Sequence, residues 1–407
     1  MAKPHLRFSE FKDEWKRLKL SDIAERVNRK NSNNETNLPL TIASLDGLVD
    51  QRTYFNKTVA SKDMSGYYLL KKGEFAYNKS YSEGYDYGSI KRLDMFDMGA
   101  LSTLYICFAL KSNTQSDFIV KYFDSQKWYK GIYAICAEGA RNHGLLNVSV
   151  NDFFDMEIWL PENKREEYQI LKLFSAIDEI INSMKSEVLL WEERKKGVMQ
   201  KIFSQEVRFK RGDGSDYPKW EEQEIGKLGE FIKGASLSKA DISETGTPFI
   251  LYGELYTTYN EVAYEIKRKT KAVVEDKYYS KMGDVVIPTS GESAEEISTS
   301  TCVMKEGVIL AGDLNIFRSD VLDGRIMSYI LNYQAKSKIA RIAQGKSIVH
   351  IQSKELGKIK IKYPTDNEEQ EKIAELLYAV DEVIQTKKQK LEKWKNIKKG
   401  LLQQMFV

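Results

Sequence analysis

Two stretches of the chain carry hydrophobic residues at the spacing of a long coiled-coil helix. Apolar positions recur alternately four and three residues apart over Ile170–Ile202 and again over Ile373–Met405. A heptad pattern sustained for more than four repeats is typical of a coiled coil. Pro161 and Pro364 stand just ahead of the two stretches, where a proline is tolerated in the first turn. The pattern predicts two helices of about 35–40 residues, each roughly 55 Å long.

The seam predicted for each helix cannot be buried by one helix alone, so we expect the two helices to pair antiparallel. The seam residues are Ile170, Phe174, Ile177, Ile181, Val188 and Trp191 in the first helix and Ile373, Leu377, Val380, Ile384, Leu391 and Trp394 in the second. Lys195 and Lys398 continue the two seams. A lysine there either specifies the register of the pair or extends to solvent at the end of the rod, and both readings stay open.

The two helices are also copies of one another. Residues 161–204 align without a gap to residues 364–407 at a constant offset of 203, and about fifteen of the forty-four pairs are identical. So long a match indicates an internal duplication. We therefore predict a globule at 1–160, a helical spacer at 161–207, a second globule at 208–363 and a second spacer at 364–407.

The two blocks outside the helices alternate apolar and polar residues in short runs, as β-strands do. The expected strands include Leu38–Ile42, Phe75–Tyr77 and Leu104–Ala109 in the first block and Pro248–Tyr252, Asp284–Pro288 and Ile359–Tyr363 in the second. A step of two tyrosines, a glycine and an acid recurs, ending in Gly73-Glu74 and in Gly283-Asp284. The fold class predicted is α+β, with two mixed α/β globules separated by a pair of long antiparallel coiled-coil helices and related by pseudo-twofold symmetry.

This arrangement lets one chain imitate a symmetric dimer, and such dimers read two DNA half-sites at a fixed separation. The same outline fits a coiled-coil scaffold that does not bind DNA and joins two protein partners. Bulk charge does not decide between the two, because 62 Lys and Arg residues face 59 Asp and Glu residues, a net charge of +3. Any nucleic-acid surface must be found from where the charges lie.

Composition and motifs narrow the class of protein further. The chain has 407 residues, 42% hydrophobic and 30% charged, which is globular composition. Its apolar runs fall short of the roughly 20 residues that cross a bilayer, and no apolar signal core follows the N-terminus, so we expect a cytoplasmic protein.

Three cysteines and three histidines show no metal-ligand spacing, and no phosphate-binding or catalytic motif is present. The paired carboxylates Glu166-Glu167 and Asp178-Glu179 lie on helices of alternating charge. We interpret them as a solvated face or a partner contact rather than as acid–base groups. The sequence favours recognition over catalysis.

At the repeated helices the chain resembles the specificity subunit of type I restriction–modification systems. The resemblance lies in the proline-started helix with an acidic first turn (PENKREEYQIL and PTDNEEQEKI), the Ile/Val-Asp-Glu-hydrophobic step, and the ending with Trp, Lys-Lys-Gly and Phe. It covers essentially all of the chain, with specific motifs in the helices and weak ones in the globules.

The resemblance implies that each globule reads one half of a bipartite, asymmetric double-stranded DNA site and that the coiled coil sets the gap. It also implies that the helices dock two modification subunits, which bind S-adenosylmethionine and methylate adenine, and that restriction subunits add ATP-driven translocation and Mg²⁺-dependent cleavage. The chain itself would be non-catalytic and would hold no cofactor and no metal.

Candidate DNA-contacting residues lie on polar loops, because base edges need amide or guanidinium partners and phosphates need cations and hydroxyls. After one strand of each globule come Asn78, Lys79, Ser80, Tyr81, Ser82 and Tyr85 in the first and Thr289, Ser290 and Gly291 in the second. Nearer the end of each globule come Arg141, Asn142 and His143 in the first and Arg341, Gln344, Lys346 and Ser347 in the second. Ordinary polar turns remain the alternative.

Two further features stay ambiguous. The basic run Lys267–Lys269 either holds phosphates or is a solvated charge run. His350, between Val349 and Ile351, reads as a core residue with satisfied hydrogen bonds.

Overall fold

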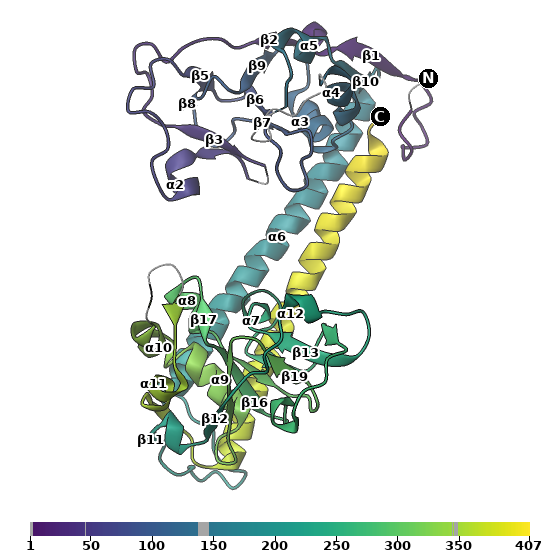
Figure 1. Cartoon of the computed structure of the whole chain (residues 1–407). Coiled ribbons are helices and arrows are strands. Elements are labelled where there is room, and N and C mark those ends of the chain that lie inside the picture. Colours follow the sequence, from purple (N-terminus) through teal and green to yellow (C-terminus); the bar gives the residue numbers. More distant parts are fainter. Residues whose placement is uncertain (1–2, 45, 137–145, 344, 346–348) are drawn as a thin grey trace. The chain divides into compact units, whose positions relative to one another are not determined.

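The computed structural model describes the whole chain except residues 1–2, 45, 137–145, 344 and 346–348 (Figure 1). Contacts divide the chain into two compact units. Unit 1 comprises Met1–Lys185 and Gln389–Val407, and unit 2 comprises Ser186–Lys388. Because the long helices α6 (Lys164–Phe203) and α12 (Asn367–Met405) are cut by this division, each unit combines one globule with part of both helices.

The globule of unit 1 is built on short antiparallel strands. Its four-stranded sheet has the order β2 (Ala24–Arg26), β9 (Ile106–Leu110), β6 (Phe75–Asn78) and β7 (Ser89–Arg92). Two-stranded pairs join β1 (Trp15–Lys19) to β10 (Glu157–Pro161), β3 (Leu40–Ala43) to β4 (Gly47–Asp50), and β5 (Tyr68–Lys71) to β8 (Met98–Leu101). The short helices are α1 (Leu20–Ile23), α2 (Gln51–Phe55), α3 (Ser116–Asp124), α4 (Tyr129–Ile135) and α5 (Val150–Asp155).

The globule of unit 2 is centred on a larger sheet. Its five strands are β12 (Glu230–Lys233), β20 (Leu314–Arg318), β16 (Asp284–Pro288), β18 (Thr301–Val303) and β14 (Val262–Ala263). Smaller sheets contain β15 (Lys269–Thr270), β13 (Thr247–Leu251) and β19 (Ile309–Ala311); β11 (Glu221–Glu224) and β22 (Lys360–Tyr363); and β17 (Ser290–Gly291) and β21 (Val349–His350). The helices are α7 (Glu254–Thr257), α8 (Ala294–Ile297), α9 (Gly324–Asn332), α10 (Lys336–Ile342) and α11 (Ser353–Gly357), with 3-10 turns at Ile225–Lys227, Lys239–Asp241 and Asp276–Tyr278.

These elements confirm the predicted α+β class with two mixed globules. The strand predicted over Asp284–Pro288 coincides with β16. The strand predicted from Leu104 begins two residues later, at Ile106, because Leu104 lies in a turn closed by the hydrogen bond from Tyr105 N to Ser102 O. Among the described residues, none of the helices is apolar over a stretch that would reach across a membrane.

The two globules share a turn built around the recurring glycine–acid step. Gly73 and Gly283 have φ of 86° and 92°, a conformation that favours glycine. The carboxylate that follows accepts a hydrogen bond from the backbone two residues before the glycine, at 2.7 Å for Glu74 and 2.8 Å for Asp284. An arginine from another strand or loop pairs with each acid at 2.7 and 2.6 Å. The likeness of the two halves therefore extends beyond the long helices.

Within each unit the long helices run antiparallel. In unit 1, Asp178 of α6 pairs with Lys398 of α12 at 2.6 Å, and Phe174 lies 6.1 Å from Phe406, ring centre to ring centre. In unit 2, Lys195 of α6 pairs with Asp381 of α12 at 2.6 Å. Later residues of one helix thus meet earlier residues of the other. The two ion pairs occupy equivalent positions, since Asp381 and Lys398 each follow their partner in the repeat by 203 residues.

Most of the seam residues are buried. Ile170, Phe174, Ile177, Ile181, Val188, Ile373, Leu377, Ile384 and Leu391 are buried, and Trp191, Val380 and Trp394 are half-buried. Near its C-terminus each helix enters a globule. The buried apolar residues there are Met199, Ile202 and Phe203 of α6, and Leu402 and Met405 of α12 with Phe406 just after it. Phe203 packs on Trp220 with ring centres 6.2 Å apart, and Phe406 packs on Trp15 at 6.0 Å.

Candidate nucleic-acid interface

The first candidate loop leaves β6 in unit 1 and is held by its own hydrogen bonds. Asn78 Oδ1 accepts from Ser80 N at 3.0 Å, and Ser82 and Tyr85 close a small turn through Tyr85 N and Ser82 O at 2.8 Å. A side chain on Gly88 would come within 2.0 Å of Asn78 O, so the strand after the loop can approach only because that residue is glycine. Tyr81 is left 60% exposed. The loop therefore presents one aromatic ring to solvent from a fixed backbone, with Lys79 half-buried beside it.

In unit 2 the corresponding residues are more enclosed. The hydroxyl of Ser290 donates to Asp313 Oδ2 at 2.7 Å, and the carbonyl of Ser290 accepts from Tyr256 Oη at 3.1 Å. Ser290 and Gly291 are buried, and Thr289 is half-buried. The polar groups of Ser290 are thus engaged inside the globule, and Thr289 is the member of this set that reaches an open groove.

In each globule the residues that follow the second candidate segment contact the first candidate loop. In unit 1, Leu146 N donates to Lys79 O at 2.9 Å. In unit 2, β21 pairs with β17 through Ser290 and His350, and Ile351 N donates to Thr289 O at 3.0 Å. The chain just after each second segment is therefore tied to the first loop by backbone hydrogen bonds.

The second segments themselves are described only in part. Arg341 lies near the end of α10 and is exposed. Arg141, Asn142, His143, Gln344, Lys346 and Ser347 lie outside the described residues.

A groove of about 740 Å³ opens beside Thr289 in unit 2. Its polar lining comprises Lys233, Ser236, Thr289, Asp313, Asn315, His350, Gln352, Ser353 and Lys354. These side chains include amides, an imidazole, hydroxyls and two lysines, the groups that pair with base edges and phosphates. Asn315 is 1% exposed, and its amide nitrogen has no hydrogen-bond partner within the described chain. A buried donor without a partner favours the binding of a ligand that brings a hydrogen-bond acceptor.

The reading of His350 as a core residue is wrong. Successive side chains of a strand point to opposite faces. Val349 is half-buried and packs against the main core of unit 2, and Ile351 is 3% exposed, so their faces are turned inward. His350 is exposed and lines the groove, and the sequence signal that could have placed it there is this alternation.

A neighbouring groove of about 750 Å³ shares Leu237, Gly312 and Asp313 with the first. It is lined by Arg268, the middle residue of the basic run, which pairs with Glu254 at 2.7 Å. Glu254 is buried, so this arginine has a structural partner. Lys267 and Lys269 are exposed on either side of it.

The expectation that Glu166 is solvated or contacts a partner is wrong, because its carboxylate is buried within unit 1. Arg7 holds it with two bonds of 2.7 and 2.8 Å, and Trp15 Nε1 donates to it at 3.3 Å. In unit 2, Arg208 and Trp220 hold Glu369 in the same way, with arginine bonds of 3.0 and 2.8 Å. Both carboxylates fix the first turn of a long helix to its globule and are not free for acid–base chemistry.

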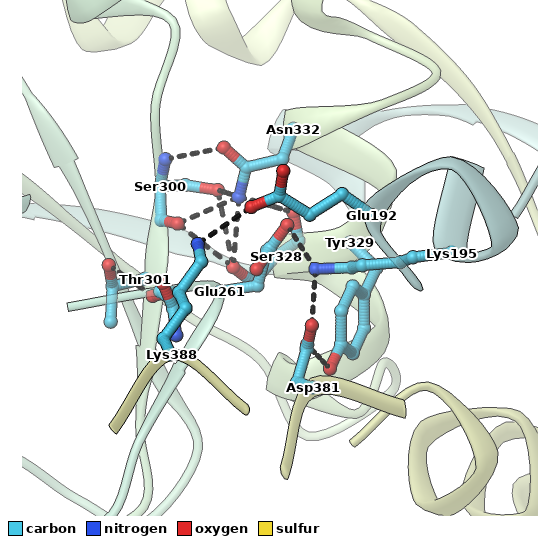
Figure 2. Close-up of polar contacts among 11 residues, drawn as sticks. Glu192, Lys195, Glu261, Ser300, Thr301, Ser328, Tyr329, Asn332, Asp381 and Lys388 are labelled. Carbon is cyan, nitrogen blue, oxygen red and sulfur yellow. Dashed lines mark hydrogen bonds and ion pairs between the residues drawn. The ribbon is translucent and has the colours of Figure 1, made fainter. Parts of the chain in front are cut away.

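Lys195 does not extend to solvent but is the centre of a cluster that joins both helices to the globule of unit 2. Its Nζ lies 2.6 Å from Asp381 Oδ1 and 2.8 Å from Glu261 Oε1 (Figure 2). Tyr329 Oη donates to Asp381 Oδ2 at 2.7 Å. Burial alone would lower the pKa of Lys195, but Glu261 and Asp381 outweigh burial and raise it. Burial, and then the charge of Glu261, raise the pKa of Asp381.

The equivalent cluster in unit 1 has the opposite composition of charges. Asp178 accepts from Lys398 of α12 at 2.6 Å and from Lys121 of α3 at 2.7 Å. Burial alone would raise the pKa of Asp178, but the two lysines outweigh burial and lower it. Both seam lysines therefore have carboxylate partners, as a role in register requires.

The described residues offer little to a metal or to a nucleophilic reaction. Among them, no three His, Cys, Asp or Glu side chains are grouped as metal ligands. Burial raises the pKa of the Cys107 thiol to about 12 and that of Cys302 well above its ordinary value, so these two cysteines stay protonated at neutral pH.

Comparison with known proteins shows which proteins this chain resembles. The model of the type I restriction–modification DNA specificity domain matches residues 217–396. This part of the chain is therefore similar to the type I specificity domain. A relative from Methanocaldococcus jannaschii, for which the role of MjaX type I restriction enzyme specificity subunit is proposed, is 28% identical over 286 residues. That match covers 67% of this chain and 63% of the relative, so the chain spans somewhat less than two thirds of that protein's length.

Solved structures agree with the specificity-subunit fold. The type I restriction–modification S subunit from M. genitalium has a TM-score of 0.55 and 15% identity, covering 100% of this chain and 99% of that one. A chain from a study of complex assembly and conformational transition of the type I restriction–modification system has a TM-score of 0.55 and 17% identity, covering 97% of both chains. At these identities the likeness is one of fold.

Proposed function

We propose that this chain is the sequence-specific DNA-binding specificity subunit of a type I restriction–modification complex. Each globule reads one half of a bipartite, asymmetric site, and the paired helices set the gap. The observation that carries the proposal is that in both units the chain just after the second candidate segment is hydrogen-bonded to the first candidate loop, next to β6 in unit 1 and β16 in unit 2, while the side chains of the two loops differ. Duplicated frames with different side chains suit two different half-sites.

The groove of unit 2 supports DNA as the ligand of the second globule. His350 and Gln352 can bond to base edges, while Lys233 and Lys354 are exposed cations that can lie against phosphates. Asn315 at the buried side of the groove adds a donor that has no partner within the described chain. In the first globule, the exposed ring of Tyr81 and the amine of Lys79 are the side chains proposed to contact DNA.

The helices carry apolar side chains outside the seam, and these support partner docking. Leu189 and Leu190 of α6 are 66% and 46% exposed, and Leu376 and Ile397 of α12 are 39% and 38% exposed. Two modification subunits would dock on such residues, bind S-adenosylmethionine and methylate adenine. Restriction subunits with ATP and Mg²⁺ would add translocation and cleavage. The chain itself contributes no catalytic group and holds no cofactor.

Mapping of methylated adenines in the host, with and without the gene for this chain, tests the proposal. The expected result is a split motif with a fixed gap that disappears with the gene. Insertion of one heptad within Ile170–Ile202 should lengthen the gap or abolish methylation. A scaffold that joins two proteins without binding DNA predicts instead no motif that depends on the gene, and no salt-dependent DNA affinity of the complex.

The groove assignment has its own test. His350→Ala should weaken binding to one half-site by about 1–3 kcal/mol, the usual contribution of a base-edge contact. His5→Ala, at an exposed histidine of unit 1, is the matched control and should leave binding unchanged. Equal affinity of wild type and His350→Ala for every target would remove His350 from the interface.

A further inference from the structure

The Lys195 cluster of unit 2 joins four elements at one buried point (Figure 2). Lys195 comes from α6, Asp381 from α12, Tyr329 from α9, and Glu261 from the segment before β14. The exposed fractions of the Lys195, Asp381 and Glu261 side chains are 13%, 13% and 20%, and Tyr329 is fully buried. Lys195 is shared by two carboxylates, and Asp381 by Lys195 and Tyr329. A cluster linked in this way leaves the globule little freedom to turn on the helices.

Both globule residues of the cluster are anchored to the same strand. Cys302 N, in β18, donates to Glu261 O at 2.8 Å. The helix α9 that carries Tyr329 is fixed just before β18, where Asn332 Nδ2 donates to Ser300 O at 2.7 Å. A shift of either long helix would therefore be transmitted through Glu261 or Tyr329 to β18.

The strand β18 leads on to the candidate interface. It pairs with β16 through Cys302 and Val285, and β16 runs directly into Thr289 and the groove. Apolar packing at the end of α6 also holds the helices to the globule, but apolar contacts are non-directional. Ion pairs and hydrogen bonds have defined geometry, and buried polar groups of this kind can specify one arrangement among several.

We propose that Glu261 and Tyr329 are positioning residues that, through Lys195 and Asp381, fix the orientation of the second globule on the helix pair and so determine which gap between half-sites is accepted. The inference rests on the proposed function, since it concerns how the second half-site is placed. It separates two properties of one globule: the groove determines which bases are read, and the cluster determines where along the DNA they are read.

The test compares the complete complex carrying wild type, Glu261→Gln or Tyr329→Phe on a series of targets with the same half-sites and gaps up to two base pairs shorter or longer. We expect wild type to methylate one gap. Glu261→Gln should raise relative methylation at the neighbouring gaps on the order of tenfold, the effect of losing one charge-assisted hydrogen bond. Tyr329→Phe should act in the same direction more weakly. The half-site sequences should be unchanged for both variants.

Controls distinguish positioning from general loosening. Glu265→Gln alters an exposed glutamate just after β14 and should keep the wild-type gap profile. The conservative variant Glu261→Asp keeps a carboxylate beside Lys195 and leaves the pair of Lys195 with Asp381 intact, so it should retain the single gap. Hydrogen exchange of α9 and β18 should be faster in Glu261→Gln than in wild type or in Glu261→Asp.

Each outcome of this test either supports or overturns the positioning role of Glu261 and Tyr329. A wild-type gap profile in Glu261→Gln, whether or not hydrogen exchange is faster, overturns the positioning role and leaves DNA recognition intact. A change of half-site sequence rather than gap also overturns it. A wild-type complex without sequence preference refutes the proposed function itself, and the positioning role with it. A gap profile that is broadened in Glu261→Gln and remains single in Glu261→Asp supports both.

Discussion

In each unit a cluster of three charged side chains joins the helix pair to the globule, and the two clusters have opposite compositions of charge. In unit 1 the carboxylate of Asp178 lies between Lys398 and Lys121, and in unit 2 the amine of Lys195 lies between Asp381 and Glu261. The helix pair is the same in both, Asp with Lys. The third charge comes from the globule and differs in sign. After duplication the helices kept their pairing, while each globule acquired its own complement to one member of the pair.

The apolar ends of the two helices differ in how many aromatic rings surround them. This difference is expected to have the largest effect on the free energy of unfolding. Phe406 contacts the rings of Trp15, Phe118, Tyr122 and Phe174 in unit 1. Removing it as Phe406→Ala should cost about 3–5 kcal/mol of unfolding free energy, because a fully buried ring is lost. Denaturant unfolding measures this cost.

The matched variant in unit 2 is Phe203→Ala, where two aromatic rings lie close, those of Trp220 and Tyr333. We expect a smaller loss than for Phe406→Ala. Ile397→Ala, at an exposed position of α12, is the control and should change the unfolding free energy by less than about 0.5 kcal/mol. A larger cost for Phe203→Ala would reverse the ranking of the two junctions.

The buried carboxylates at the helix starts give the next effect. Glu166→Ala leaves the guanidinium of Arg7 unpaired at 12% exposure, and Glu369→Ala leaves that of Arg208 unpaired at 22% exposure. Breaking such a pair from one side costs about 3 kcal/mol or more when the remaining charge is buried. We expect Glu166→Ala to be the more costly because Arg7 has less access to water.

Thermal or denaturant unfolding of both variants, with Glu179→Ala at an exposed position of α6 as control, measures the difference. An effect of Glu166→Ala no larger than that of Glu179→Ala would mean that water replaces the carboxylate at Arg7.

The sequence predicted what depends on local periodicity and not what depends on distant partners. The helices and their pairing follow from heptads within each stretch and from the repeat. The burial of Glu166 does not, because its partner Arg7 is 159 positions away and the acidic first turn resembles a solvated surface. Lys121 and Glu261 lie in segments with no motif, so the third charge of each cluster had no sequence signal. The meeting of β17 and β21 likewise depends on the tertiary fold.

The opposite charges predict opposite pH dependence at the two junctions. The pKa of Asp178 is lowered on folding, so its ionised form stabilises unit 1 above its ordinary pKa, and this contribution is lost as the pH falls through the lowered value. The pKa of Asp381 is raised by burial and Glu261, so the folded state gains stability as the pH falls through that raised value. As the pH falls, the junction in unit 2 therefore becomes more stable at a higher pH than that at which the junction in unit 1 becomes less stable.

Unfolding free energies of Asp178→Asn and Asp381→Asn, measured against wild type between pH 7 and pH 4, check the signs. The cost of Asp178→Asn should be nearly constant over this range. As the pH falls, the unfolding free energy of wild type should increase relative to that of Asp381→Asn. The same slope for both variants would show that the two carboxylates titrate alike and that the charge inversion has no consequence.

The smallest effect should come from the surface pair of Lys388 and Glu192, which also joins α12 to α6 in unit 2. Its atoms are 2.7 Å apart, close to the distance in the Lys195 cluster, but the side chains are 47% and 38% exposed. Water screens such a pair, so a double-mutant cycle with Lys388→Ala and Glu192→Ala should give a coupling of about 0.5 kcal/mol or less. A cycle on Lys195 and Glu261 should give a clearly larger coupling. Equal couplings would mean that burial adds nothing to the cluster, and that distance alone determines how firmly a globule is held to the helices.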